Sequence, residues 1–221
     1  MAGYTLLQEE AYTHIKEQIL SGALREEQIY SETKIAAMIG ISRTPVKDAL
    51  VRLSQERLVD ILPSRGFRLH RMSEADIWDT YQVRTAVEGF CVVHLAHRKD
   101  TPEGRAAIAE LEESITRMKA LAEAPIEELW QEDLAFHRRL VVFSGNREFA
   151  QLFESCNHRM SVIAKQSFQS PNRRQAAIAE HQAILDAVRA CSGRDDLTAY
   201  GALRTHMEAS RDIVLREDPS R

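Results

Sequence analysis

The chain has 221 residues, a length that allows one or two domains, and its low glycine (9) and proline (6) counts favour a mainly helical protein. The formal net charge is −4, so the chain as a whole is not a polycation of the kind that coats nucleic acid. No apolar stretch approaches the ~18 residues needed to cross a bilayer, and the N-terminus lacks the layout of a secretory signal. The three cysteines are widely separated, which is typical of reduced proteins. We therefore expect a cytoplasmic protein without a membrane span.

Three short helices are predicted in the N-terminal third. The first covers about residues 9–20, after an irregular lead-in over residues 1–8. The second covers about residues 32–39 and ends at Gly40, where a chain leaving a helix often takes a positive φ. The third begins near Pro45, because proline is tolerated in a first turn whose N–H groups have no partner within the helix. A helix, a tight turn and a second helix together form a helix-turn-helix.

Capping residues are assigned from local chemistry. Ser31 is expected to cap the second helix. For the third helix Thr44 is preferred to Ser42, since the residue before a proline avoids the α region.

The third helix has one apolar face, formed by Val46, Ala49, Leu50 and Leu53. Arg43, Thr44 and Lys47 lie at its N-terminal end and off that face, where a recognition helix meets base edges and phosphates. Ser42 stands immediately before them. Free N–H groups at a helix N-terminus also favour an anion such as phosphate.

A two-stranded wing is predicted after the helices, because residues 59–61 and 67–69 alternate around a turn that carries Arg65 and Gly66. Between residues 31 and 71 there are eight Lys/Arg against four Asp/Glu, although the chain is acidic overall. Such a local basic face is typical of a DNA-binding protein.

The alternative is a helical hairpin with a solvated charged face. The helix spacing, the Ser-Arg-Thr-Pro start and the Arg-Gly turn together favour DNA binding.

From Ser73 onward the pattern is helical, and Ser73-Glu74-Ala75-Asp76 is a capping-box variant that is expected to open the first of these helices. Six helices are expected, over about residues 74–97, 102–121, 125–144, 147–167, 173–190 and 195–215. Short connections predict an antiparallel six-helix bundle. Residues 72–221 carry 19 Lys/Arg and 24 Asp/Glu, so this part is not expected to bind DNA. The predicted fold is mainly α, with a winged helix-turn-helix domain over residues 1–71 and an all-α effector and dimerisation domain over residues 72–221.

Asp133 and His137 are four residues apart on one predicted helix, so both project from one face. His181 and His206 lie on two later helices. One carboxylate and three imidazoles can surround a divalent cation such as Zn, Ni, Mn or Fe. Spacing alone leaves open that each histidine is an ordinary, partly buried side chain.

Two resemblances make the prediction more specific. Residues 42–50, with Leu53, Leu58-Val59 and residues 63–67, resemble the DNA-binding domain of the GntR family of bacterial transcription regulators. The Asp-x-x-x-His of residues 133–137, the Ser-Gly-Asn of 144–146, Glu180-His181 and a histidine on the last helix resemble the FCD effector domain of the FadR subfamily. Six helices rather than seven are similar to its VanR-like branch. Two turns depart from the family pattern: Arg25-Glu26-Glu27-Gln28 stands where Pro-Gly is usual, and Arg57 where glycine is usual.

The resemblance implies a ligand-responsive repressor that binds a pseudo-palindromic double-stranded DNA operator as a homodimer. It implies DNA contacts by Ser42, Arg43, Thr44, Lys47, Arg65 and Gly66. It also implies a metal held by Asp133, His137, His181 and His206, with a small organic acid as effector. Arg84 and Asn146 are the residues assigned to that effector, although Arg84 is also placed to pair with Glu88 four residues on.

Two other function classes fit the sequence less well. A metal-dependent hydrolase using the Asp/His cluster would need a general base near an open metal position, and the sequence has no Ser-His-Asp or Cys-His pattern. A purely architectural DNA binder would not need an effector domain of ~150 residues. We therefore expect a regulator without enzymatic activity.

Overall fold

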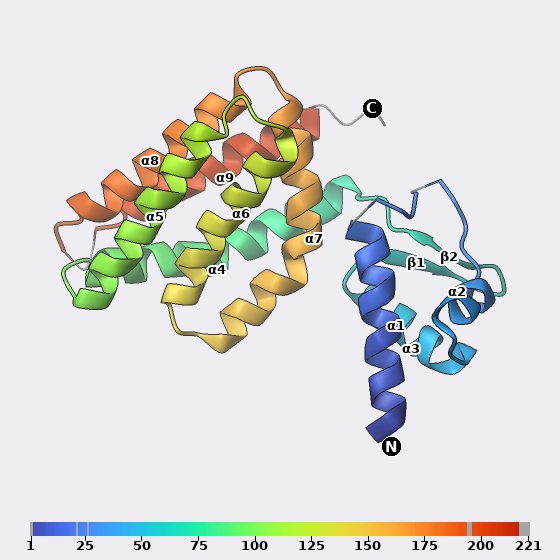
Figure 1. Ribbon diagram of the computed structural model, residues 1–221. Coiled ribbons are helices and arrows are strands. Elements are labelled where there is room, and N and C mark those ends of the chain that lie inside the picture. Colours follow the sequence, from blue (N-terminus) through green and yellow to red (C-terminus); the bar gives the residue numbers. More distant parts are fainter. Residues whose placement is uncertain (1, 21, 26, 194–195, 217–221) are drawn as a thin grey trace. The chain divides into compact units, whose positions relative to one another are not determined.

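The computed structural model describes residues 2–20, 22–25, 27–193 and 196–216 (Figure 1). The chain divides into two compact units, Met1–Met72 and Ser73–Arg221, which are described separately. None of the described helices is long and apolar enough to span a membrane.

The first unit is a winged helix-turn-helix, as predicted. Its elements are α1 (Ala2–Leu20), α2 (Glu32–Ile39), α3 (Arg43–Gln55), β1 (Val59–Leu62) and β2 (Gly66–Leu69). The apolar face of α3 is completely buried against α1 and the wing, with Val46, Ala49 and Leu53 at 0% exposure. The two strands pair antiparallel, with Ile61 opposite Phe67.

Helix α1 begins at Ala2, so the predicted irregular lead-in over residues 1–8 is wrong for the described residues 2–8. The prediction placed the start by the apolar stripe, which begins at Ala11. Before Ala11, most of residues 5–10 are exposed although they are helical, and Leu6 is 70% exposed. No proline lies in this stretch to stop the helix from extending.

The caps of α2 and α3 follow the predicted pattern in part. Gly40 takes φ 79° at the end of α2, as expected. Ser42, not Thr44, is the N-cap residue of α3, so the preference for Thr44 is wrong; the helix accommodates Thr44 ahead of Pro45 in its first turn. Neither Ser31 nor Ser42 makes a side-chain capping bond.

Of the two turns that depart from the family pattern, the structure describes the one at Arg57 in full. Arg57 takes φ 55°, a left-handed conformation that costs a non-glycine residue roughly 1–2 kcal/mol. Glycine is usual at this position because it can adopt a positive φ without this cost. The Arg25–Gln28 turn includes residue 26, which lies outside the described residues.

Gly66 is required by packing at the base of the wing. Tyr30 N donates to Phe67 O (2.7 Å) and Phe67 N donates to Tyr30 O (3.0 Å), which brings a third extended segment against β2. Gly66 has φ 110°, and a Cβ there would lie 2.0 Å from Tyr30 O. The residue that the sequence assigned to DNA contact thus has a structural role as well.

We predict that Gly66→Ala destabilises the first unit by about 2–4 kcal/mol, because the clash with Tyr30 O adds to the cost of a positive φ. Urea unfolding followed by far-UV circular dichroism measures the change. Gly40→Ala is the matched control, since Gly40 has φ 79° but open space at its Cβ position. Equal losses of unfolding free energy in the two variants would show that the clash with Tyr30 O adds nothing to the cost of the positive φ.

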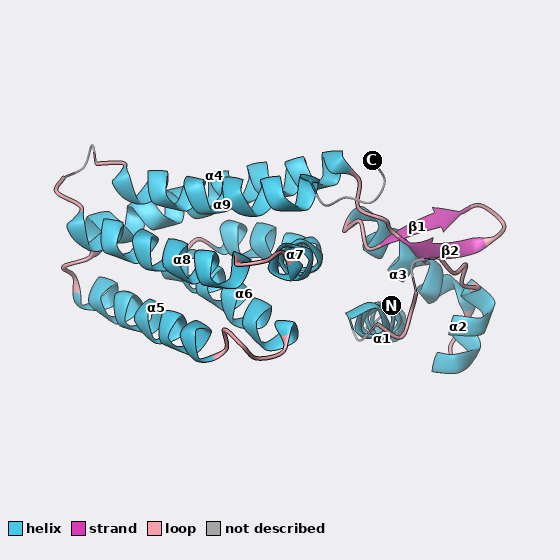
Figure 2. Ribbon diagram, turned by 90° about the horizontal axis from the view of Figure 1, so that it is seen from above, coloured by secondary structure: helices cyan, strands magenta, loops and turns pink. Residues whose placement is uncertain are grey.

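The second unit is an antiparallel helical bundle, as predicted (Figure 2). Its described helices are α4 (Glu74–Arg98), α5 (Pro102–Ala120), α6 (Ile126–Phe143), α7 (Arg147–Gln169), α8 (Arg173–Ala190) and α9 (Thr198–Arg216). Helix α4 packs against α6, α7 and α9, and α8 packs against α5 and α9. Side chains of α6, α8 and α9 therefore meet α4 in the interior of the bundle.

Helix starts in this unit follow the capping chemistry. Ser73 and Asp76 form the predicted capping box of α4, and Thr101 accepts from Gly104 N at the start of α5. Helix α9 begins at Thr198 rather than near residue 195. Asp196 explains the difference, because its carboxylate accepts from both Ser192 N and Thr198 N (2.9 Å each) and so holds the chain in a loop.

Candidate metal centre and DNA-binding face

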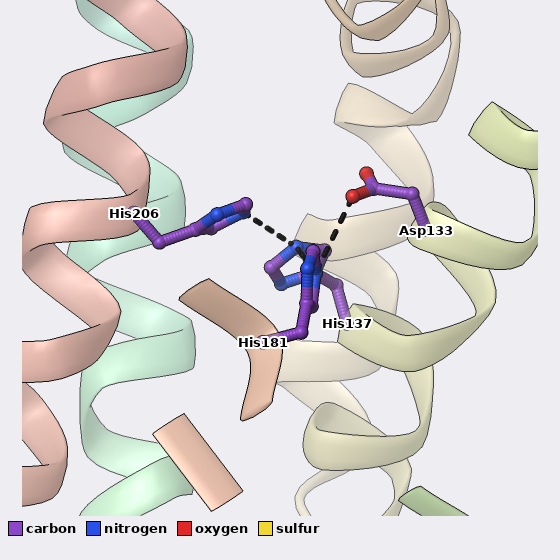
Figure 3. A group of neighbouring side chains, drawn as sticks. All are labelled: Asp133, His137, His181 and His206. Carbon is purple, nitrogen blue, oxygen red and sulfur yellow. Dashed lines mark hydrogen bonds and ion pairs between the residues drawn. The ribbon is translucent and has the colours of Figure 1, made fainter. Parts of the chain in front are cut away.

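Asp133, His137, His181 and His206 lie together inside the helical bundle (Figure 3). Helix α6 contributes the first two, one turn apart, whereas α8 and α9 each contribute one histidine. Asp133 is 5% exposed and the histidines are 0–2% exposed. One ligand atom from each residue lies within 4.8 Å of all the others. The five contacts of these imidazoles with another imidazole or with a carboxylate, described below, each join two different helices.

The three imidazoles point their Nε2 atoms at one another. His137 Nε2 lies 3.2 Å from both His206 Nε2 and His181 Nε2. Asp133 Oδ1 lies 3.3 Å from His181 Nε2. Metal–ligand distances of about 2.0–2.2 Å place neighbouring ligand atoms on the order of 3 Å apart. These three separations match those between neighbouring ligand atoms of a coordination sphere.

The other nitrogen of each ring faces a hydrogen-bond acceptor. His137 Nδ1 lies 2.5 Å from Glu88 Oε2, and His206 Nδ1 lies 2.7 Å from Glu180 Oε2. His181 Nδ1 lies 2.6 Å from the carbonyl oxygen of Ala177. Because these partners accept hydrogen bonds, the network assigns the proton of each neutral ring to Nδ1. All three Nε2 atoms then present lone pairs to the same point.

Burial keeps two of the rings neutral. It lowers the pKa of His181 to about 4, although Asp133 opposes the shift. Burial, together with the other two histidines, also lowers the pKa of His206 well below its usual value. Neutral imidazole is the form that binds metals, so these environments favour coordination over protonation.

Two carboxylates link arginines to the ligating histidines. Glu88 accepts from Arg84 Nε through Oε1 (2.7 Å) and faces His137 through Oε2. Burial opposes ionisation of Glu88, but Arg84 and His137 outweigh it and lower its pKa to about 2. Glu180 repeats the arrangement, accepting from Arg173 Nη1 through Oε1 (2.7 Å). Such carboxylate–histidine pairs fix the tautomer and orientation of a metal ligand.

Sequence reasoning missed both outer carboxylates. Glu88 was considered only as the partner of Arg84, and Glu180 only as part of the motif that it forms with His181. In the structure Glu180 projects toward His206 on the neighbouring helix. The sequence offered a weak signal for each acid. Glu180 is adjacent to His181, and Glu88 lies on another helix of the same predicted bundle.

The residues present fit a divalent cation. Asp133 Oδ1 is buried and has no hydrogen-bond donor among the described residues. His181 Nε2 lies 3.3 Å from it and carries no proton in the assigned tautomer. A carboxylate oxygen and three lone pairs converging in a buried space repel one another unless a positive charge lies between them. Three nitrogens and one oxygen suit Zn, Ni, Mn or Fe.

The two residues assigned to the effector lie in different environments. Arg84 is 6% exposed, and its Nη2 is buried without a hydrogen-bond partner among the described residues. Arg84 can therefore pair with Glu88 through Nε and still donate to an anion through Nη2. Asn146 is exposed and caps α7 by accepting from Glu148 N and Phe149 N. The structure does not bring Asn146 into the buried cluster, and its effector role remains a prediction.

The residues assigned to DNA lie on the surface of the first unit. Ser42, Arg43, Thr44 and Lys47 are exposed around the N-terminus of α3, and Arg65 is exposed in the turn between the wing strands. Gly66 follows Arg65 and begins β2. Arg43 Nη2 donates to Glu32 Oε2 at 3.1 Å.

Comparisons with known proteins cover nearly the whole chain. Residues 7–69 match the family described as bacterial regulatory proteins, gntR family, and residues 79–209 match the FCD domain. An HTH-type transcriptional regulator in an unstable DNA locus of Streptomyces ambofaciens is 28% identical over 94% of this chain and 84% of its own length. The HTH-type transcriptional repressor GlaR of Escherichia coli is 23% identical over 95% of this chain and 96% of its own length.

A solved structure shows the same fold. Escherichia coli McbR/YncC superposes with a TM-score of 0.70 at 21% identity, over 96% of this chain and 98% of that one. The winged helix-turn-helix, the helical bundle and the two family matches agree. The chain therefore belongs to the GntR family of bacterial regulatory proteins, in the subfamily whose DNA-binding domain is joined to an FCD domain.

Proposed function

We propose that this DNA-binding regulator is a repressor whose FCD domain holds a divalent metal and senses a small carboxylate in the cytoplasm. The observation that carries the proposal is the buried cluster in which three Nε2 atoms and Asp133 Oδ1 converge on one point. A cluster with this donor set is costly to bury unless it binds a cation. The repressor role is supported by the similarity to GlaR, which is named a repressor.

The carboxylate class of effector follows from the groups around the cluster. A bound metal would supply a Lewis-acid position for a carboxylate oxygen. Arg84 offers a buried N–H group that has no hydrogen-bond partner in the described part of the chain, and its charge interacts with Asp133. Guanidinium groups bind carboxylates with good geometry, so Arg84 would neutralise and orient the acid. The carboxylate of the effector would accept from Arg84 Nη2, while Glu88 continues to accept from Arg84 Nε.

Coupling to DNA runs through α4. This helix carries Arg84 and Glu88, and it starts at Glu74, five residues after the wing strand β2 ends at Leu69. A change in how Arg84 and Glu88 are engaged acts on the helix that leads directly into the DNA-binding unit. A coupling of about 1–3 kcal/mol changes operator affinity by roughly 5- to 150-fold.

On DNA, we propose that α3 enters the major groove with Arg43, Thr44 and Lys47 toward the bases, while Ser42, Arg65 and Gly66 contact the backbone or minor groove. One recognition helix and one wing make few contacts, so two copies on a pseudo-palindrome are needed for tight specific binding. A homodimer supplies the two copies. Its half-sites would lie one helical turn, or a multiple of it, apart.

The salt dependence of binding provides a prediction. The logarithm of operator affinity is expected to fall linearly with the logarithm of salt concentration, by about 0.9 per phosphate contact. Fluorescence anisotropy on a labelled duplex, between roughly 50 and 200 mM salt, measures the slope. Lys47→Ala should reduce the slope by about one for each half-site contacted. A flat dependence would contradict electrostatic docking of this face.

The metal-dependent hydrolase receives no support from the arrangement of acids. A hydrolase needs a general base facing an open metal position. Among the described residues, the carboxylates next to the ligating histidines are Glu88 and Glu180, and each is engaged by an arginine and by a histidine Nδ1. Both are placed to orient ligands rather than to activate water.

The proposed function is tested on the purified full-length protein. Elemental analysis should find about one divalent metal per chain, and native mass spectrometry should find that metal and any small acid carried through purification. Removing the metal with a chelator and restoring it should change affinity for the operator reversibly. A protein that binds DNA identically in both states would rule out the metal as part of the sensor.

We also predict that Glu88→Gln weakens metal binding by about 10- to 100-fold, because it removes the charged acceptor that orients His137. Competition with a chromogenic chelator measures the affinity. Glu132→Gln is a suitable control, since Glu132 is a partly buried carboxylate on α6 that pairs with Arg117 and Arg139 instead. If both variants keep the wild-type affinity, the outer carboxylate does not tune the site.

A further inference from the structure

We propose that Glu32 is a positioning residue that sets the sequence selectivity of Arg43. The inference rests on the proposed base-reading role of Arg43. Glu32 is the first residue of α2, and Arg43 is the first residue of α3. Arg43 Nη2 donates to Glu32 Oε2 at 3.1 Å, which ties the two helix starts together across the turn.

The two side chains differ in how firmly they are held. The Glu32 side chain is 15% exposed, whereas that of Arg43 is 57% exposed. Glu32 also sits in the first turn of α2, where the helix dipole favours an anion. The carboxylate is thus the anchored partner and the guanidinium the free one. Glu32 therefore restricts where the Arg43 guanidinium can point.

The pair leaves Arg43 able to read a base. One N–H of its fork is engaged by Glu32, and the side chain is exposed at the N-terminus of α3, where its other donors are accessible to DNA. Arginine reads guanine by a bidentate contact, whose geometry depends on the orientation of the guanidinium. Of the basic residues assigned to DNA, Arg43 alone forms an ion pair within the described part of the chain; Lys47 and Arg65 do not. The carboxylate thus acts on the one side chain with the geometry for base readout.

A negative charge on this face has a second consequence. Glu32 repels phosphates, which weakens binding to every DNA sequence alike. Holding Arg43 strengthens only the binding to its preferred base. Glu32 therefore raises the ratio of specific to non-specific affinity by both routes.

The test compares Glu32→Gln with wild type on two labelled duplexes, a site enriched by the wild-type protein from a random-sequence library and a scrambled duplex of equal length. We expect the affinity for the enriched site to fall and the affinity for scrambled DNA to rise. The specificity ratio should drop about tenfold, equivalent to about 1.4 kcal/mol. Glu9→Gln is the control, because it removes the same charge from an exposed pair with Arg52 in the same unit.

The outcomes separate the possible roles. Equal rises on both duplexes would show that Glu32 acts only as a charge, and equal losses with a lower melting temperature would show that it only stabilises α2; either would overturn the proposal. If Arg43→Ala by itself keeps the operator preference, the reading role of Arg43 fails instead, independently of Glu32.

Discussion

Replacing His137 by alanine is expected to empty the metal site. His137 Nε2 is the atom that lies 3.2 Å from both other histidine Nε2 atoms, so its loss removes the centre of the ligand set. Metal content should fall from about one per chain to a small fraction, measured by inductively coupled plasma mass spectrometry. Because ligands that bind only the native state stabilise it, the variant should also lose the stabilisation, about 2.7 kcal/mol at a metal concentration 100 times Kd, that metal gives the wild type.

The stability effect separates metal loss from simple damage to the core. Wild-type protein should melt higher with metal than after chelation, whereas His137→Ala should melt at one temperature under both conditions. His97→Ala is the matched control, because His97 is an exposed histidine on α4. Equal metal content in His137→Ala and the control would refute the ligand set.

Replacing Arg43 by alanine is expected to abolish specific operator binding. A bidentate arginine contact is worth about 1–3 kcal/mol of base discrimination, and a dimer makes it in each half-site. Two contacts together account for about 2–6 kcal/mol, so the specific complex should approach the affinity of non-specific DNA. DNase footprinting and anisotropy measure the loss.

The fold should survive that change, since the Arg43 side chain is 57% exposed and its one ion pair lies at the surface. Arg138→Ala is the control: it removes an equally exposed, ion-paired arginine from the helical bundle. A footprint that persists unchanged in Arg43→Ala would show that another residue reads the operator.

Local sequence signals were sufficient for most of the fold. Helix α8 has the predicted bounds, and the Ser73–Asp76 capping box forms as predicted, because caps and breakers act within a few residues. The start of α1 was missed because unpacked helical turns leave no apolar pattern. The start of α3 was missed because a residue before proline usually avoids the α conformation, whereas Thr44 adopts it within the first turn of the helix.

The site was predictable only in part from the residues themselves. The spacing of Asp133 and His137 fixes their common face, since both are on one helix. The convergence of His181 and His206 depends on how α8 and α9 pack, and it was suggested by the family resemblance rather than by spacing. Glu88 and Glu180 were missed because their contacts with histidines on other helices arise from the same packing.

The most direct test is operator affinity measured in a two-by-two design, with metal present or stripped and with or without a panel of small mono-, di- and tricarboxylates. For the metal-loaded wild type, we predict that at least one acid changes the affinity by roughly 5- to 150-fold. Metal-stripped protein and His137→Ala should not respond to that acid. An operator affinity that is the same in every state, or a full response in His137→Ala, would contradict control of this regulator by a metal-centred carboxylate site.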